Sequence, residues 1–258
     1  MLLPTGVGGN KAVKPGRQEF GWVNILTEGV EMNKIYAVLA AAGKGRRLET
    51  EIPKQYLLLA GKPLLAHSLL VFDRHFEVDG LVLVVGAGWE DEGRRLAAEI
   101  GVRKLTAVVT GGRERQESVY RGLLAVPEQA GTVLIHDAAR PLITDALISR
   151  MIAAALRTGA AVPAIPVKDT VKVADSKGLV QESLERSCLV AVQTPQAFAR
   201  KVILSAHMKA VQDKFQGTDD AMVVERLGLP VEVVAGDERN LKITTKLDLK
   251  LAELLMTE

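Results

Sequence analysis

Cysteine is almost absent from this chain of 258 residues, which contains Cys188 alone. A single thiol excludes a disulfide within the chain and is compatible with a reducing cytosol. An excess of one charge is also missing, because 33 basic residues nearly balance 31 acidic ones and leave a net charge of +2. The chain therefore lacks the overall cationic field that attracts nucleic acid, and any basic chemistry must be local.

Long apolar runs are missing as well. No stretch reaches the roughly eighteen consecutive apolar residues that a membrane-spanning helix requires, and no apolar segment follows a basic start as in a secretory signal. We therefore expect a soluble, cytoplasmic protein without a membrane partner. Residues 1–33 show no helical or strand period, so we expect an N-terminal extension with little structure before a domain at 34–258.

The sequence does contain an alternation of apolar β-rich runs and helical stretches. The β-rich runs lie at 35–39, 81–85, 105–109 and 133–135, and helical patterns include 64–72 and 115–124. Such alternation predicts parallel strands joined by right-handed crossovers, and hence an α/β fold with a doubly wound, mostly parallel sheet. In this architecture a ligand lies beyond the carboxyl ends of the strands.

A small, glycine-containing loop follows the first of these runs. Residues 39–48 read LAAAGKGRRL, and Pro53-Lys54-Gln55-Tyr56 comes soon after. Two glycines let successive N–H groups point into one concavity, and the basic residues supply charge for an anion, so we interpret this segment as a nucleotide triphosphate loop. It is neither a P-loop nor a dinucleotide fingerprint, since Leu48 stands where the latter needs a small residue. An ordinary strand-to-helix turn with solvated basic residues is the alternative.

Two further segments carry candidate polar groups after predicted strands. In GGRERQESV at 111–119, exposed N–H groups and the Ser118 hydroxyl could read the edge of a base, although a glycine-rich helix cap explains the same pattern. In HDAARP at 136–141, Asp137 suits a metal or substrate contact, and a buried ion pair is the alternative. We interpret the four histidines as structural or solvated, and we predict no metal site built by the protein.

The α/β rhythm breaks at about 164–192. Prolines, a DSKG turn at 175–178 and short β-rich runs predict a hairpin arm. An isolated two-stranded arm is only marginally stable, so we expect it to pack on the same arm of a second subunit in a homodimer. Further on, Thr218 is the expected N-cap of a helix, and Lys242 lies in a short β-type run at 241–244. A solvated surface lysine is the ordinary interpretation of Lys242.

Taken together, the motifs resemble one family. AAGxGxRL, PKQY, GGxERxxSV, HDAARP, the DT of the arm, QTPQ and NLKIT occur in the order found in the 2-C-methyl-D-erythritol 4-phosphate cytidylyltransferases of the non-mevalonate isoprenoid pathway. The resemblance runs from about Lys34 to the end, so residues 1–33 have no counterpart. It implies a Rossmann-like nucleotidyltransferase fold and the formation of a CDP-alditol and pyrophosphate from CTP and a polyol phosphate with Mg²⁺.

The resemblance also implies roles for individual residues. Lys54, Lys242 and Arg47 would be catalytic, acting as cations on the phosphates. The nucleotide would be bound by Ala41, Ala42, Gly43 and Gly45 on the triphosphate side and by Gly112 and Ser118 at the cytosine. The second substrate would be bound by Asp137, Arg140 and Thr194, together with Thr170 and Arg186 from the arm of the other subunit. Because a phosphate monoester is largely dianionic near neutral pH, no general base is required.

Three alternatives remain at the level of the sequence. A cytidylyltransferase of the same fold could act on another polyol phosphate, such as ribitol 5-phosphate, since the polyol pocket is not legible. A nucleotide-cofactor dehydrogenase is disfavoured by Leu48 and by the lack of an acidic residue after the second strand. A noncatalytic nucleotide-sensing module is disfavoured by the presence of both lysines and of Arg186.

Overall fold

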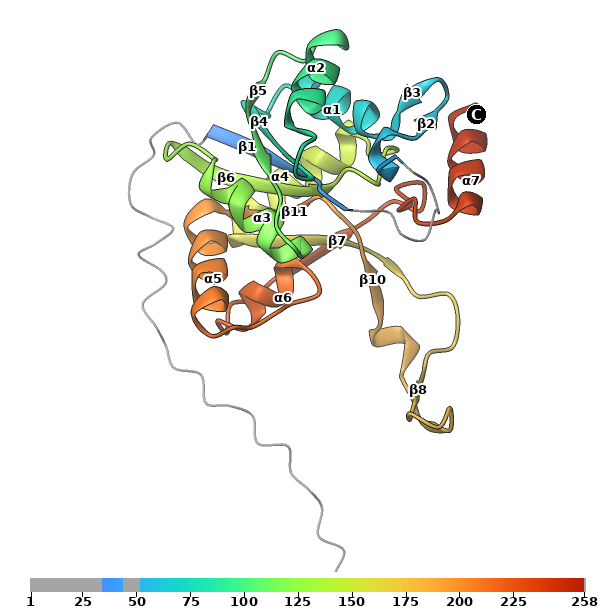
Figure 1. Ribbon diagram of the computed structural model, residues 1–258. Coiled ribbons are helices and arrows are strands. Elements are labelled where there is room, and N and C mark those ends of the chain that lie inside the picture. The colour runs from blue at the N-terminus through green and yellow to red at the C-terminus, as the bar shows by residue number, and fades with distance from the viewer. Residues whose placement is uncertain (1–33, 44–51, 258) are drawn as a thin grey trace, which may run out of the picture.

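The computed structural model describes residues 34–43 and 52–257, and an α/β sheet forms its centre (Figure 1). The eight strands of this sheet are β1 (Lys34–Ala41), β4 (Gly80–Val85), β5 (Leu105–Thr110), β6 (Ala130–Asp137), β7 (Ala160–Pro166), β10 (Val190–Val192), β11 (Gln196–Ala199) and β12 (Glu232–Ala235). Their order is β10-β7-β11-β6-β1-β4-β5, with β12 paired to β7. The described helices include none with the length and apolar character needed to cross a membrane.

The sheet is mostly parallel. Strand β1 pairs in parallel with both β4 and β6, β4 pairs in parallel with β5, and β12 does so with β7. Strand β11 is antiparallel to both β6 and β7, and β10 is antiparallel to β7. The carboxyl ends of β1, β4, β5 and β6 therefore meet at one edge, where ligands bind in open α/β sheets.

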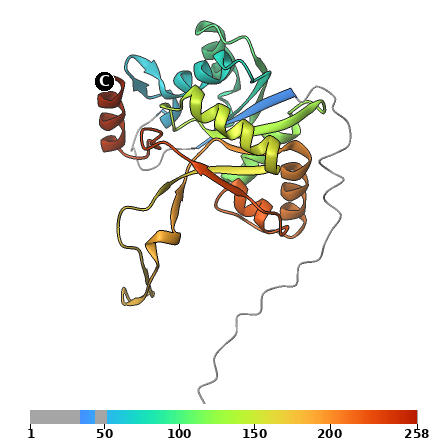
Figure 2. The ribbon, with the colours of Figure 1, turned by 180° about the vertical axis from the view of Figure 1, so that it is seen from behind.

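Helices cover both faces of the sheet. One hydrophobic cluster contains side chains of α1 (Leu64–Arg74), α2 (Glu90–Glu99) and α4 (Asp145–Thr158). A second cluster contains side chains of α3 (Arg115–Leu124), α5 (Arg200–Gln212) and α6 (Asp220–Glu225). Figure 2 shows α4, in yellow-green, across the face of the sheet that Figure 1 turns away from the viewer. These two layers confirm the doubly wound arrangement predicted from the sequence.

The surroundings of strand β1 explain why its sequence is one continuous apolar run. Ile35, Ala37 and Leu39 face the first cluster, whereas Tyr36 and Val38 face the second. Side chains alternate between the two faces of a strand, and here both faces are covered by helices. Because such a strand has no polar face, its residues do not alternate between apolar and polar. In the sequence, the end of the strand is therefore recognisable only from the change to alanine and glycine.

Smaller elements flank the edge at which the strands end. Residues Lys54–Tyr56 form a short 3₁₀ helix, η3, which is followed by the hairpin of β2 (Leu58–Leu59) and β3 (Lys62–Pro63). The last helix, α7 (Lys246–Thr257), contributes Ala252 to a third apolar cluster with Leu59, Leu64 and Ile243. This cluster joins β2 and the start of α1 to the chain around Lys242, which is far away in sequence.

The predicted arm is present and extends away from the sheet (Figure 1). It contains the antiparallel pair β8 (Lys172–Ala174) and β9 (Val180–Ser183), followed by a 3₁₀ turn, η4 (Arg186–Cys188). Every residue of β8 and β9 is exposed. The ends of the predicted range, 164–166 and 190–192, belong instead to β7 and β10 of the central sheet.

Two local predictions are wrong. The N-cap of α6 is Asp219, whose side chain accepts a hydrogen bond from the Met222 N–H at 2.9 Å, and not Thr218. Asp219 is held there because its other carboxylate oxygen accepts from the Gln196 side chain at 2.7 Å. Residues 241–244 do not form a strand, since Ile243 donates a single backbone hydrogen bond to Ala139.

Candidate active site

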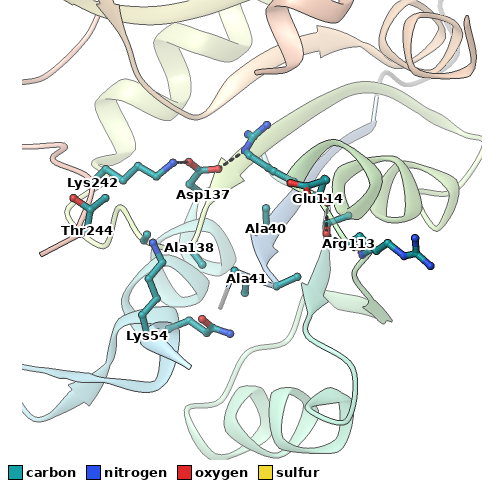
Figure 3. Close-up of a pocket in the computed structure, with 16 residues that line it drawn as sticks. Ala40, Ala41, Lys54, Arg113, Glu114, Asp137, Ala138, Lys242 and Thr244 are labelled. Atoms are coloured by element: carbon teal, nitrogen blue, oxygen red, sulfur yellow. Dashed lines mark hydrogen bonds and ion pairs between the residues drawn. The ribbon is translucent and has the colours of Figure 1, made fainter. Parts of the chain in front are cut away.

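A pocket of about 450 Å³ opens at the carboxyl ends of β1 and β6 (Figure 3). Its walls come from the end of β1, from η3, from the turn between β5 and α3, from the end of β6 and from the segment before α7. The residues that line it are Ala40, Ala41, Ala42, Gly43, Lys54, Gln55, Gly112, Arg113, Glu114, Arg115, Ser118, Asp137, Ala138, Ala139, Lys242 and Thr244.

The two lysines singled out from the sequence line this same pocket (Figure 3). Lys54 comes from η3, and its ammonium donates to the carbonyl oxygen of Ile243 at 3.3 Å. Lys242 is the residue just before Ile243 in that segment, and its side chain is 39% exposed. The contact to Ile243 therefore ties the first lysine to the backbone that carries the second. Two cations from distant parts of the chain share one cleft.

Asp137 lies at the centre of the charged groups. Its Oδ2 atom accepts from the Lys242 ammonium at 2.6 Å and its Oδ1 atom accepts from Arg115 Nε at 2.9 Å. Burial alone would raise the pKa of Asp137, but the charges of Arg115 and Lys242 hold it well below its ordinary value. The carboxylate is therefore ionised across the working pH range, and it holds Lys242 at the wall of the pocket.

Arg115 is a site residue that the sequence reasoning did not single out. It is the first residue of α3, and besides Asp137 it contacts Asp220, which accepts from Nη1 at 2.8 Å. Its only signal in the sequence is its place in GGxERxxSV, four residues after the first glycine. Its partners lie 22 and 105 residues away, so no local spacing could have revealed the pairs.

The floor of the pocket is made of small residues. Ala40 and Ala41 are the last residues of β1, Ala42 and Gly43 follow them, and Ala138 and Ala139 follow β6. The turn after β5 lies against this floor, since a Cβ atom built on Gly111 would be only 2.4 Å from the Cβ of Ala42. Glycine is required at position 111 by this close approach. A ligand on this floor would therefore contact mainly backbone atoms rather than side chains.

Ser118 holds the turn after β5 in place. Its hydroxyl accepts from the Gly112 N–H at 2.9 Å and donates to the Glu114 carbonyl at 2.9 Å. The side chain is buried in α3 but still borders the pocket. Ser118 thus ties the glycine turn to α3, whereas the N-cap residue of the helix, Glu114, makes no side-chain capping hydrogen bond. Both hydrogen bonds of the hydroxyl are made to the backbone of the same chain. Ser118 therefore contributes to the pocket by fixing the shape of the turn.

Thr194, His136 and Arg140 support the site from within. The His136 Nε2 atom lies 3.1 Å from the Arg140 carbonyl, which can only accept, so Nε2 carries the proton. Nδ1 therefore accepts from the Thr194 hydroxyl, whose oxygen in turn accepts from the Asp137 N–H at 3.0 Å. Arg140 donates to the Asn240 carbonyl at 2.7 Å. None of the three lines the pocket, and Arg140 is not the partner of the Asp137 carboxylate.

The internal position of His136 gives a pH-dependent stability. Burial lowers the pKa of His136 to about 4, whereas the unfolded chain keeps a pKa near 6.5. The unfolded state thus binds more protons between these values, so stability falls as the pH falls. We expect a loss of about 2 kcal/mol between pH 7 and pH 5 from this residue. Urea unfolding at both pH values checks this, and His136→Gln, which cannot titrate, should lose that part of the slope. An unchanged slope in the variant would contradict the assignment.

The remaining predicted residues lie elsewhere. Thr170 and Arg186 are exposed on the arm, where Arg186 Nη1 donates to the Lys168 carbonyl at 2.8 Å, and neither lines the pocket of its own chain. Gly45 and Arg47 lie outside the described residues. Within the part of the chain that the structure describes, no group of three or more His, Cys, Asp or Glu side chains gathers to hold a metal ion.

Solved structures define the class to which this fold and pocket belong. The crystal structure of 4-diphosphocytidyl-2C-methyl-D-erythritolsynthase from Anaerococcus prevotii has a TM-score of 0.78 and 31% identity, over 88% of this chain and 97% of that one. The 2-C-methyl-D-erythritol 4-phosphate cytidylyltransferase of Thermus thermophilus has a TM-score of 0.72 and 33% identity, over 86% and 98%. The chain is therefore an α/β protein of the nucleotidyltransferase class.

Sequence relatives narrow the class to one family. The family model described as "IspD: 2-C-methyl-D-erythritol 4-phosphate cytidylyltransferase" matches residues 35–258. The 2-C-methyl-D-erythritol 4-phosphate cytidylyltransferase of Pelotomaculum thermopropionicum is 49% identical over 226 residues, which are 87% of this chain and 95% of that protein. That of Syntrophus aciditrophicus is 46% identical over 224 residues, or 86% and 96%. The chain belongs to the 2-C-methyl-D-erythritol 4-phosphate cytidylyltransferase family, as its motifs predict.

Proposed function

We propose that this protein transfers the cytidylyl group of CTP to 2-C-methyl-D-erythritol 4-phosphate and releases pyrophosphate. The observation that carries the proposal is the pocket in which Lys54 and Lys242 converge over a floor of alanine and glycine, in a chain of this family. A nucleotide triphosphate and a sugar phosphate are both polyanions. Cations fixed on two sides of one cleft are what such a pair of substrates requires.

The chemistry needs positioning and charge rather than a base. An oxygen of the substrate phosphate attacks the α-phosphorus of CTP, a new P–O bond forms, and the bond to the β-phosphate breaks so that pyrophosphate leaves with the electron pair. The attacking phosphate is mostly dianionic near neutral pH because its second pKa is about 6. Lys54, Lys242 and Arg47 would stabilise the charge that grows on the oxygens of the α-phosphorus. No Ser-His-Asp arrangement is needed.

The nucleotide side of the site follows from the small residues. Ala41, Ala42, Gly43 and Gly45 would wrap the triphosphate, because their backbone N–H groups can approach phosphate oxygens without hindrance. The turn of Gly112, shaped by Ser118, would face the cytosine. Since the Ser118 hydroxyl is already engaged, the reading of the base would rest on backbone groups of this turn.

The second substrate would lie on the side of Asp137. Arg140 and Thr194 would act there indirectly, since Arg140 holds the segment of Lys242 and Thr194 holds the backbone of Asp137. Thr170 and Arg186 of a second copy would bind the phosphate of the methylerythritol. Their exposure on the arm, outside the pocket of their own chain, supports a role in a neighbouring site.

A divalent cation, Mg²⁺, fits the residues of this pocket as a partner of the nucleotide. Mg²⁺ is commonly held by one or two carboxylates together with substrate phosphates. Both oxygens of Asp137, the carboxylate on the pocket wall, already accept from Lys242 and Arg115, so the phosphates of the nucleotide would supply most of the ligands. When bound, the ion would neutralise phosphate charge. The residues of the chain would still orient the substrates, because the lysines approach from two other directions.

The experiment that tests the function is a pyrophosphate-release assay. Purified protein is incubated with CTP, Mg²⁺ and 2-C-methyl-D-erythritol 4-phosphate, and in parallel with ribitol 5-phosphate. We expect release with the methylerythritol phosphate and little with the ribitol phosphate. A preference for ribitol 5-phosphate would replace the substrate assignment, and an absence of release with either would favour a nucleotide-sensing role.

The arm leads to a second, separate prediction, that the protein is a homodimer. Leu179 and Val180 are about 60% and 61% exposed on the arm, and such apolar residues are expected to pack on a second copy. Size-exclusion chromatography with light scattering should give twice the mass of one chain. Replacing both residues with serine should shift the population toward the monomer. A stable monomer of the unchanged protein under assay conditions would refute the homodimer.

A further inference from the structure

A line of alternating charges leads from the pocket into the interior. Lys242 contacts Asp137, Asp137 contacts Arg115, and Arg115 contacts Asp220, at 2.6, 2.9 and 2.8 Å respectively. We call these four residues the charge chain. The exposed fraction of the side chain is 39% at Lys242, 10% at Asp137 and 1% at Asp220. The first three members line the pocket, while the last is fixed in the second helical layer.

The inner end of the charge chain is held rigidly. Asp220 is the first residue of α6, and its N–H donates to the Gln196 side chain at 3.1 Å. Its Oδ1 atom lies 3.2 Å from Nε2 of His207, a fully buried residue of α5. Its carboxylate therefore has a second partner besides Arg115. Although burial opposes ionisation, Arg115 and His207 hold the pKa of Asp220 below its ordinary value.

Arginine is needed in the middle of the chain for a geometric reason. Arg115 donates one hydrogen bond from Nε to Asp137 and another from Nη1 to Asp220. Two N–H groups of one planar guanidinium therefore point at two carboxylates. A lysine carries the same charge at a single atom and cannot reproduce both contacts in the same directions. The orientation of the Asp137 carboxylate thus depends on where α6 holds Asp220.

We propose that Arg115 and Asp220 are positioning residues for cytidylyl transfer. Asp220 fixes the guanidinium, the guanidinium fixes the Asp137 carboxylate, and that carboxylate fixes the ammonium of Lys242 where the α-phosphate of the nucleotide would lie. Neither residue needs to touch the substrate. The inference rests on the role proposed above for Lys242, and it extends the site to α6 and to the second layer of helices.

The first expected result is a loss of turnover without a matching loss of binding. Arg115→Lys and Asp220→Asn should each lower kcat about 10- to 100-fold, the range for residues that orient a functional group from behind. KM for CTP should change less than about threefold, because Lys242 is placed to act on the transition state. Arg157→Lys is the matched control, because Arg157 also pairs with a carboxylate, Glu232, but on the surface.

A double-mutant cycle separates positioning from general damage. If Arg115 acts through Lys242, then Arg115→Lys should cost little further activity in a Lys242→Ala protein. Asp220→Asn should behave in the same way. A loss that is equally large in both backgrounds would overturn the proposal, as would an unchanged kcat in the two single variants. Circular dichroism melting verifies that each variant is folded at the assay temperature, and the nearly isosteric Asp220→Asn serves if Arg115→Lys does not fold.

The same cycle distinguishes this inference from the proposed function. Near-normal turnover of Lys242→Ala alone would remove the role of that lysine, and with it the positioning role that depends on it. A strong loss in Lys242→Ala combined with additive losses in the double variants would leave the proposed function intact and reject only the positioning role of Arg115 and Asp220.

Discussion

Replacing either Lys54 or Lys242 with alanine is expected to lower turnover by about 10²- to 10³-fold, the scale observed when one preorganised transition-state donor is removed. Both ammonium groups line the same pocket and approach it from different elements, so neither can substitute for the other. Steady-state pyrophosphate release measures the effect. The loss should appear mainly in kcat, because the charge on the α-phosphate oxygens grows as the transition state forms.

The two lysine variants differ in one respect that the experiment should control. Lys54 also donates to the Ile243 carbonyl, so its removal loosens the segment that carries Lys242. Lys54→Arg retains a donor and a charge and should restore the melting temperature more fully than it restores turnover. Lys201→Ala, at an exposed position of α5, is the matched surface control and should leave turnover unchanged. Near-normal turnover in both alanine variants would reject the catalytic roles.

Asp137→Asn is expected to have the largest effect on stability. The substitution keeps the shape of the side chain but leaves Arg115 and Lys242, whose side chains are 29% and 39% exposed, without their shared carboxylate. Both cations retain access to water and Arg115 keeps Asp220 as a partner, so we expect a loss of about 2 to 3 kcal/mol, still a large fraction of the roughly 5 to 15 kcal/mol that stabilises a domain. Urea unfolding at pH 7 measures the change in the free energy of unfolding.

The pH dependence of this effect has a definite sign. Because the folded-state pKa of Asp137 is held below its unfolded value, the stabilisation is present above about pH 4 and is lost as the pH falls through the folded pKa. The unchanged protein and Asp137→Asn should therefore converge in stability toward low pH. Asp91→Asn, which removes a fully exposed partner of Arg94, should show no measurable change. Equal stability of both variants at pH 7 would contradict the central place of Asp137.

The sequence was sufficient for much of the fold because the sheet is buried on both faces. Continuous apolar runs such as 81–85 form strands that are covered by helices on both faces of the sheet. The helix α3 occupies the predicted range of 115–124. The failures are local and have a tertiary cause. Thr218 and Asp219 are both good N-caps, and the choice between them depends on Gln196 of β11, a contact over 23 residues that no local pattern contains.

Part of the lining of the candidate site could be predicted, because some of its residues lie in motifs of their own. Lys54, Asp137 and Lys242 were found because each lies in a recognisable motif, and the pocket brings them together. What the sequence could not supply is the pairing among them. The Lys242–Asp137 and Arg115–Asp220 pairs each span 105 residues, and a buried ion pair of Asp137 was only an alternative at the level of the sequence. Which charged residues form ion pairs over such separations depends on the order of the strands, and that order follows from the packing of the whole sheet.

The floor of alanine and glycine has a consequence for inhibitors of this enzyme family. A compound that fills the space above Ala41, Ala42 and Ala138 would contact mainly main-chain atoms, which mutation cannot change. Any larger side chain at these positions would exclude the compound, but it would also fill the space in which we propose that the nucleotide binds. Substitutions in this floor that give resistance to the compound should therefore also lower the activity of the enzyme. Substitutions in the walls of the pocket around Arg113 and Glu114, which present side chains, are less restricted.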